Sequence, residues 1–345
     1  MPGAVVIVLS VFRVIDLSPD GKLDVRDHIE KVAPPAEGTL RWVDLQGDGK
    51  DGKNLDRLRD EFAFHPLAIE DCRVFDQRPK LEEYSDHLFL VTQSFAPAEA
   101  GKEAGEACGN EHLRLYELHA FLGKDYLVTV HSGEIAALEQ VRERVINNPP
   151  LIERGVDFVY YLIASRLVEA NFPILDAITD ELEDLEDRVL AVPDRSDLAR
   201  IFDLKRRLVL MRKVLSPQRD TMVMLARRGD QRVSERSALY FRDVHDQLVR
   251  LNESIEANRD LLGNALDAYL SAVSNRTNEI MKYLTLLSAV FLPLAFIVGF
   301  FGQNFEDLPS LPHWTQSDAL MHVMLGLCAA TPISMYVWFR LRRWI

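Results

Sequence analysis

The 345-residue sequence lacks the motifs by which many enzymes are recognised. It has no Gly-rich phosphate loop ending in Gly-Lys-Ser or Gly-Lys-Thr, no Gly-x-Ser-x-Gly nucleophile motif and no His-Glu-x-x-His zinc motif. Cysteine is scarce, and Cys72, Cys108 and Cys328 match no metal or disulfide pattern, as expected in a reducing compartment. We therefore expect no enzyme, no resident cofactor and no nucleotide partner.

Positive charge is outnumbered, with 40 Lys and Arg against 53 Asp and Glu, a net charge of -13. Nucleic acids are bound by Lys and Arg clusters, so no nucleic-acid partner is expected. Cations are the natural counterparts, although solubility alone accounts for most of these carboxylates. The densest acidic cluster is interpreted as a solvated helical tip and not as a metal site; it comprises Asp180, Glu181, Glu183, Asp184, Glu186 and Asp187.

Two long stretches near the end lack any charged residue, residues 283–301 and 319–339. Each has about 20 residues, the length that crosses roughly 30 Å of hydrocarbon at 1.5 Å per residue. They predict two transmembrane helices joined by an extracytoplasmic loop over residues 302–318. The bilayer is therefore an expected partner.

The loop between these stretches contains no Lys or Arg, whereas basic residues flank the pair. Arg276 and Lys282 precede the first stretch, and residues 340–345 form a basic tail. By the positive-inside rule both termini are cytoplasmic, which predicts a multi-pass protein of the cytoplasmic (inner) membrane. The apolar run over residues 4–14 lacks the features of a signal peptide and is expected to be a first strand.

In the region before the first apolar stretch, a strand-like hydrophobic pattern gives way to a helical one. Residues 1–135 predict a cytoplasmic α/β domain, with strands over residues 5–14, 40–45, 87–95, 113–122 and 126–131. Residues 136–235 predict a helical hairpin region, in which one helix runs from Gly155 to Val192. A turn at Pro193-Asp194 leads into a second helix that ends near Arg228.

Residues 236–282 predict a long stalk helix that continues into the membrane. No proline occurs between Pro217 and Pro293, and an apolar stripe recurs at helical spacing. We expect each stalk to be buried by the next subunit of a parallel bundle, and therefore a homo-oligomer. The stripe consists of Val244, Leu248, Leu251, Ile255, Leu262, Leu266, Tyr269 and Val273.

Around the first apolar stretch, small or apolar side chains share one helix face: Met281, Leu284, Ser288, Leu292, Ala295 and Gly299. If this face lines a central axis, Met281 and Leu292 would form constrictions that gate by dewetting. A lipid-facing or helix-packing surface is the alternative that periodicity leaves open.

The loop adds neutral and acidic oxygens. Gly302 allows a turn at the membrane edge, and Asn304 offers a carbonyl oxygen that suits a hydrated cation such as Mg²⁺. Glu306 and Asp307 would raise the local cation concentration. An ordinary polar loop is the alternative.

Several motifs together resemble the CorA family of divalent-cation (Mg²⁺/Co²⁺) transport proteins, in the two-span GxN superfamily. They occur in order over most of the chain: His65-Pro66-Leu67-Ala68-Ile69-Glu70-Asp71, Gln77-Arg78-Pro79-Lys80, Tyr240-Phe241-Arg242-Asp243, Ser274-Asn275-Arg276-Thr277-Asn278-Glu279-Ile280-Met281-Lys282, Phe291-Leu292-Pro293-Leu294-Ala295-Phe296-Ile297, Gly302-Gln303-Asn304-Phe305-Glu306 and the tail at Trp344.

The resemblance implies an α+β membrane protein that forms a homopentamer, with the first transmembrane helices lining a pore above a funnel of stalk helices. Asn304 would form an external selectivity ring and Asn278 a polar ring near the cytoplasmic mouth. Gly299 would be a narrow ring, and the hydrophobic gate would comprise Met281, Leu284 and Leu292. Mg²⁺ would be both substrate and regulatory ligand, the latter between subunits at Asp71 and Asp243.

Three departures from the family pattern bear on the ion. Gln303 stands where methionine is usual, Ala295 where a hydroxyl is common and Ser310 where a second acid is frequent. The favoured function is passive uptake of Mg²⁺, with Co²⁺ or Ni²⁺ as further cargo. A proton-coupled Zn²⁺ transporter resembling ZntB, using His313 or His322, is one alternative. A non-conducting, membrane-tethered module such as a metal sensor or scaffold is the other.

Overall fold

The computed structural model describes residues 11–27, 32–47, 52–98, 112–227, 230–301 and 318–344. The chain divides into two compact units, Met1–Asp267 and Ala268–Ile345. The strands are β1 (Val11–Leu17), β2 (Leu23–Asp27), β3 (Leu40–Gln46), β4 (Lys80–Glu83), β5 (Leu88–Pro97), β6 (Leu113–Leu122) and β7 (Tyr126–His131).

In the first unit these strands form one mixed sheet in the order β2-β1-β3-β7-β6-β5-β4. Strands β3 and β7 run parallel, and the other neighbours are antiparallel. The predicted strands at β3, β5, β6 and β7 are confirmed. The two edge strands β2 and β4 are not predicted from the sequence, because their exposed or charged residues hide the alternation that marks a half-buried strand.

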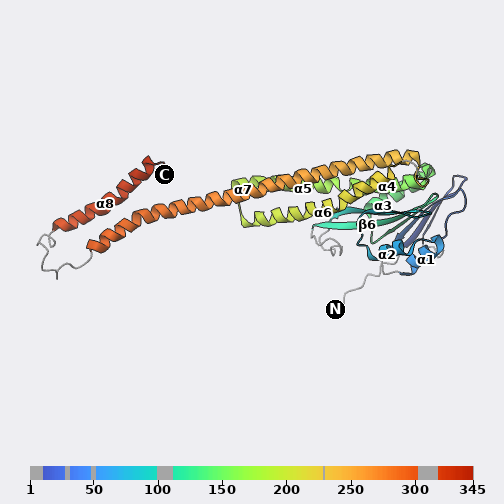
Figure 1. Ribbon diagram of the computed structural model, residues 1–345, viewed down its shortest axis with the longest axis horizontal. Helices are drawn as coiled ribbons and strands as arrows, with labels where there is room; N and C mark the ends of the chain where they lie inside the picture. Colours follow the sequence, from blue (N-terminus) through green and yellow to red (C-terminus); the bar gives the residue numbers. More distant parts are fainter. Residues whose placement is uncertain are drawn as a thin grey trace. The chain divides into compact units, whose positions relative to one another are not determined.

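Helices cover both faces of the sheet (Figure 1). Helices α1 (Gly52–Phe62) and α2 (Pro66–Val74) pack Leu58 and Ile69 against Val43, Phe121 and Val128 on one face. Helices α3 (Ala136–Asn147) and α4 (Val156–Glu169), joined by the short 3-10 helix η1 (Pro149–Arg154), lie on the other side. This core fixes α2, and with it Asp71, on the sheet.

The single helix expected from Gly155 to Val192 is wrong, because the chain breaks between α4 and α5 (Phe172–Ala191). Asn171 is buried at the break, and its Nδ2 donates to the carbonyls of Leu167 (2.8 Å) and Val168 (3.1 Å). Its Oδ1 accepts from the Phe95 amide of β5 (3.1 Å), which ties the break to the sheet. The expected turn at Pro193-Asp194 is present, and Asp194 caps α6 (Arg195–Leu225).

Helix α7 (Glu235–Phe301) has 67 residues and confirms the long continuous helix. The expectation that neighbouring subunits bury its stripe is wrong over the part in the first unit. Val244, Leu248, Leu251 and Ile255 are fully buried within the single chain. Side chains of α7 reach α5 and α6 through Asn258 Nδ2 to Thr179 Oγ1 (2.9 Å), Arg212 Nε to Glu256 (2.9 Å) and Asn252 Nδ2 to the Leu215 carbonyl (3.4 Å).

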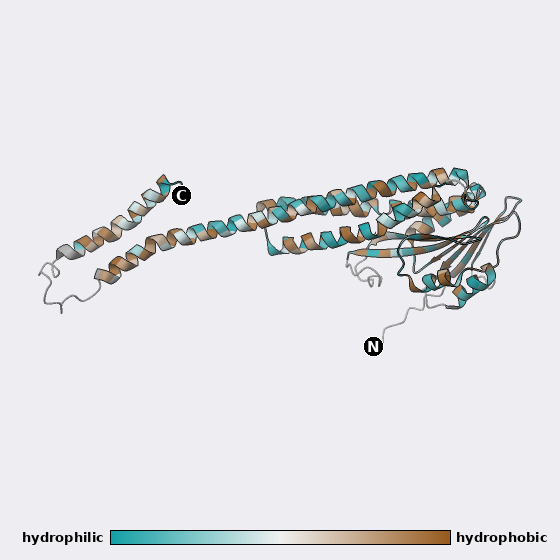
Figure 2. Cartoon of the chain, viewed as in Figure 1, coloured by the Kyte–Doolittle hydropathy of each residue, from teal (hydrophilic) through white to brown (hydrophobic). Residues whose placement is uncertain are grey.

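The second unit consists of the C-terminal part of α7 and of helix α8 (Asp318–Leu341). Both helices are long and apolar enough to cross a membrane. Hydrophobic residues predominate along both of these segments (Figure 2). Of the predicted stalk stripe, Tyr269 and Val273 fall in this unit; Tyr269 is buried and Val273 is exposed.

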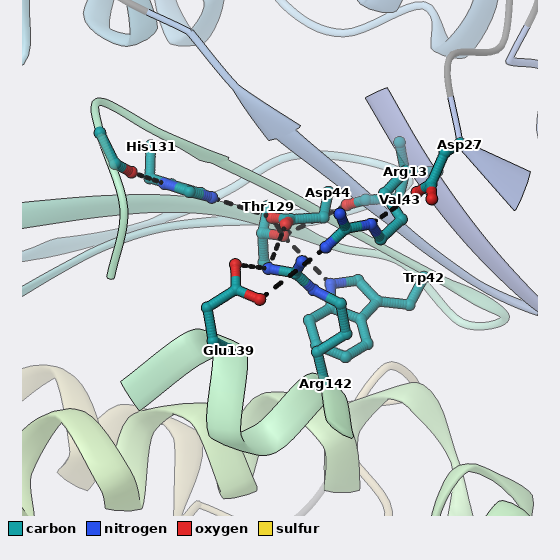
Figure 3. A network of polar contacts seen from close by, with 10 residues as sticks. Arg13, Asp27, Trp42, Val43, Asp44, Thr129, His131, Glu139 and Arg142 are labelled. Carbon is teal, nitrogen blue, oxygen red and sulfur yellow. Dashed lines mark hydrogen bonds and ion pairs between the residues drawn. The ribbon is translucent and has the colours of Figure 1, made fainter. Parts of the chain in front are cut away.

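A buried polar network holds α3 on the sheet of the first unit (Figure 3). The Asp44 carboxylate accepts from Thr129 Oγ1 (2.6 Å), pairs with Arg142 of α3 (3.2 Å) and lies 3.3 Å from His131 Nε2. His131 Nδ1 faces the Gly133 carbonyl (2.6 Å), which can only accept. Both ring nitrogens therefore face acceptors, an arrangement that favours the doubly protonated ring. Burial lowers the pKa of His131, but Asp44 and these hydrogen bonds outweigh it and raise that pKa.

Since the folded pKa of His131 lies above its unfolded value of about 6.5, its stabilisation is complete below that pH and is lost as pH rises through the folded pKa. We predict that His131→Gln destabilises by on the order of 1 kcal/mol at low pH, with a smaller effect at high pH. Thermal unfolding of the full chain in detergent at several pH values measures this, with the exposed His112→Gln as control. A destabilisation that is constant or grows with pH contradicts the network's charge state.

Candidate functional site

The candidate pore residues on α7 are all exposed in the single chain: Asn278, Met281, Leu284, Ser288, Leu292, Ala295 and Gly299. At 100° per residue, the set from Met281 to Gly299 spans an arc of about 80°. We call this arc the Ser288 face. The partly covered positions lie on the opposite side of the helix: Leu286, Ala289, Val290, Pro293, Leu294 and Ile297.

The Ser288 face is therefore not the side of α7 that is covered within the chain. It is free to line an axis, to meet lipid or to contact other copies. Leu292 is 77% exposed, an unusual state for a leucine unless a bilayer or another protein surrounds it.

Two threonine side chains in the apolar helices donate hydrogen bonds to backbone carbonyls of their own helix. Thr285 Oγ1 donates to the Met281 carbonyl (2.8 Å), and Thr331 Oγ1 donates to the Leu327 carbonyl (2.7 Å). Such internal bonds are what a hydrocarbon environment requires. At the end of α8, the Phe339 and Trp344 rings stack at 5.9 Å, and Arg342 lies over Trp338. Aromatic and basic residues so placed suit a membrane interface.

The predicted filter lies outside the residues that the structure describes. This holds for Gly302, Gln303 and Asn304, and for the acidic pair Glu306 and Asp307. The described helix α7 ends at Phe301, immediately before them. Their roles stay predictions.

The two predicted regulatory carboxylates lie on different elements of the first unit. Asp71 is on α2, and its Oδ2 pairs with Lys80 Nζ at 2.6 Å. Asp243 is on α7, and its Oδ2 accepts from Gln247 Nε2 at 2.9 Å. Within the described part of the chain, no group of three or more His, Cys, Asp or Glu side chains could hold a metal ion. A divalent cation at either carboxylate would therefore need further ligands, from water or another copy of the chain.

The acidic cluster of α5 is solvated, as expected. Asp180, Glu183, Asp184 and Asp187 are exposed. Glu181 instead pairs with Arg207 (2.6 Å) and Arg200 (3.6 Å) of α6.

Sequence reasoning assigned no role to Lys80, which the structure places on Asp71. The same ammonium lies 2.6 Å from Glu82 Oε1, and Tyr84 Oη donates to Glu82 Oε2 at 2.9 Å. Burial and the neighbouring Glu82 raise the pKa of Tyr84 to about 12, so its hydroxyl remains a donor. The spacing of two between Lys80 and Glu82, which places them on one side of the edge strand β4 with Tyr84 directly after it, is the signal that could have found them.

An α/β domain, a long helix packed on a helical hairpin, and two apolar C-terminal helices together define a two-span membrane protein with a large polar part. The model of the family described as CorA-like Mg²⁺ transporter protein matches residues 37–343. The chain belongs to this family, which is a family of transporters and not of enzymes.

Two individual relatives are similar to the chain over most of its length. YfjQ of Bacillus subtilis is 34% identical over 316 residues, covering 92% of this chain and 93% of that protein. The cobalt/magnesium transport protein CorA of Thermotoga maritima is 32% identical over 319 residues, 92% of this chain and 87% of that protein.

Among solved structures, the complete CorA magnesium transporter of Methanocaldococcus jannaschii superposes with a TM-score of 0.79 at 24% identity, over 99% of this chain and 100% of that one. The ZntB cytoplasmic domain of Vibrio parahaemolyticus gives 0.56 at 14% identity, over 76% and 98%. These two likenesses show the fold.

If the Ser288 face meets water and the flank of the helix meets lipid, cysteines at the two positions will differ in reactivity. In a background with Cys72, Cys108 and Cys328 replaced by Ala, we predict that Ser288→Cys reacts with a charged methanethiosulfonate at least about tenfold faster than Leu287→Cys. Leu287 is a fair control because it is also exposed in the single chain (56%). Equal rates in membranes would contradict the assignment.

Proposed function

We propose that the protein is a channel for passive uptake of Mg²⁺, driven by the membrane potential, with Co²⁺ or Ni²⁺ as further cargo. The observation that carries the proposal is the exposed Ser288 face on an apolar helix of a CorA-family chain. At about 100 mV a divalent cation gains roughly 4.6 kcal/mol on entry, which sustains accumulation without ATP. The absence of a nucleotide motif from the sequence agrees with this.

The proposed assembly is a homopentamer in the cytoplasmic (inner) membrane with both termini in the cytoplasm. In it, five copies of α7 surround the axis with their Ser288 faces inward. Met281, Leu284 and Leu292 then form the hydrophobic gate, Asn278 the polar ring at the cytoplasmic mouth and Gly299 the narrow ring above. The apolar surface left exposed in the single chain supports burial by neighbouring copies and lipid.

In this proposal, the loop that follows α7 determines which cation passes. Mg²⁺ gives up its water reluctantly, so a ring of Asn304 oxygens would bind first-shell waters in place of the ion itself. Gln303 adds a second amide beside this ring, and Glu306 with Asp307 would concentrate cations outside it.

Regulation uses Asp71 and Asp243, at which Mg²⁺ bound between subunits would stabilise the closed, symmetric state. The lack of a complete metal site within the described part of one chain supports ligands shared between copies. Loss of cytoplasmic Mg²⁺ would leave carboxylates to repel one another and release the gate.

A proton-coupled Zn²⁺ transporter is the second candidate. The likeness to the ZntB cytoplasmic domain shows a shared fold, Gln303 departs from the family pattern without deciding between the two ions, and His322 lies in α8. Coupling to protons is the property that separates it from a channel.

The first prediction concerns flux into liposomes that hold the purified protein. We expect Mg²⁺ to enter without a pH gradient and Asn304→Ala to reduce entry at least about tenfold, because the filter loses its amide oxygens. Gln316→Ala, which removes an amide from the same loop, is the matched control. Zn²⁺ entry that requires a pH gradient would move the assignment to the second candidate, and absence of flux for every ion would favour a sensor or scaffold.

The second prediction concerns inhibition by Mg²⁺ on the cytoplasmic side. Asp243→Asn removes a proposed ligand charge, so the Mg²⁺ concentration that halves flux should rise by about tenfold. Asp246→Asn, three residues further along α7 and exposed, should leave it unchanged. An unchanged midpoint in Asp243→Asn would exclude this carboxylate from regulation.

A further inference from the structure

Asp71 already has a cationic partner within its own chain. Lys80 Nζ lies 2.6 Å from Asp71 Oδ2 and 2.6 Å from Glu82 Oε1, so one ammonium bridges two carboxylates. The pair is sheltered: the side chains of Lys80 and Asp71 are 29% and 21% exposed. Lys80 Nζ also lies 5.6 Å from the centre of the Phe89 ring, which favours a cation there.

Glu82 can still pair with the Lys80 ammonium when Asp71 binds a metal ion. Its second oxygen accepts from Tyr84 Oη at 2.9 Å, which fixes the carboxylate on β4. Lys80, Asp71 and Glu82 together carry a net charge of about -1 at neutral pH, and not the -2 of two bare carboxylates.

A divalent cation that approaches Asp71 therefore competes with the Lys80 ammonium for the Asp71 carboxylate. It must either share the carboxylate with a positive charge a few ångströms away or drive Lys80 onto Glu82 alone. Both cost free energy, and both reduce affinity relative to an unpaired carboxylate.

We propose that Lys80 is a tethered monovalent cation that competes with the regulatory divalent cation for Asp71, with Glu82 as the acceptor that holds the ammonium when the metal binds. The proposal rests on the role of Asp71 in the proposed function. Lys80 thereby sets the cytoplasmic concentration at which the metal binds, keeping the site weak enough to empty when the ion becomes scarce.

Binding of Mn²⁺ to the full chain in detergent, followed by the EPR signal of the free ion, tests this without any transport. The expected result is that Lys80→Met and Lys80→Gln bind Mn²⁺ at about tenfold lower concentration than the unaltered protein. Lys80→Arg keeps the charge and should stay within about twofold of it. Lys213→Met removes an exposed positive charge of α6 and serves as the matched control.

A double-mutant cycle assigns the effect to Asp71. In an Asp71→Asn background, Lys80→Met should no longer shift the Mn²⁺ midpoint. The proposal is overturned if both neutral variants, shown to be folded by thermal unfolding, leave the midpoint unchanged or raise it. It is equally overturned if the shift persists without the Asp71 carboxylate.

Flux measured on the same proteins separates this proposal from the proposed function. A shifted Mn²⁺ midpoint with no Mg²⁺ entry in the unaltered protein would refute transport and leave the Lys80 competition standing. Normal Mg²⁺ entry with an unshifted midpoint would refute the competition alone.

Discussion

The apolar surface at the C-terminal end of α7 is the constraint on which the rest of the structure depends. Met281, Leu284 and Leu292 are each more than half exposed, and so are Tyr283 and Phe296 on other sides of the same segment. Each side chain of this size costs about 1.5 to 3 kcal/mol if left in water, so such a surface cannot stay hydrated. A bilayer resolves this for a helix long and apolar enough to cross it, and in the proposed assembly further copies of the chain would cover the Ser288 face.

The same helix has a different environment in the first unit. From Val244 to Ile255 its stripe is fully buried within its own chain, and the nearby Asn258 and Glu256 contact α5 and α6. The stalk therefore has a packed core before any assembly forms. Asp243, the proposed regulatory carboxylate, lies on the packed part of α7, and the Ser288 face lies on the apolar part. One continuous helix thus carries both the proposed regulatory carboxylate and the proposed gate, and in the proposed function it would link a change at Asp243 to Leu292.

Strong periodic signals made much of this predictable. The charge-free stretches, the proline-free run that forms α7 and the central strands could be predicted, because burial on a regular period leaves a clear pattern in sequence. The break at Asn171 could not, because it depends on the Phe95 amide of a distant strand. The intrachain burial of the α7 stripe was also missed, because an apolar stripe does not say which partner covers it.

The candidate site likewise has a part that could be predicted from the sequence and a part that could not. The Ser288 face follows from spacing alone, whereas the pairing of Lys80 with Asp71 depends on how α2 packs beside the edge strand β4. The identification of Asp71 and Asp243 came from family resemblance, because two carboxylates among 53 carry no distinguishing pattern.

In the proposed function the membrane potential alone drives the ion. The most direct test imposes a K⁺ diffusion potential on liposomes at equal pH on both sides and records Mg²⁺ entry. For a passive channel, Mg²⁺ entry should rise as the interior is made more negative, with no nucleotide and no pH gradient. Entry that does not change with the potential, or that occurs only after a pH gradient is added, would contradict it.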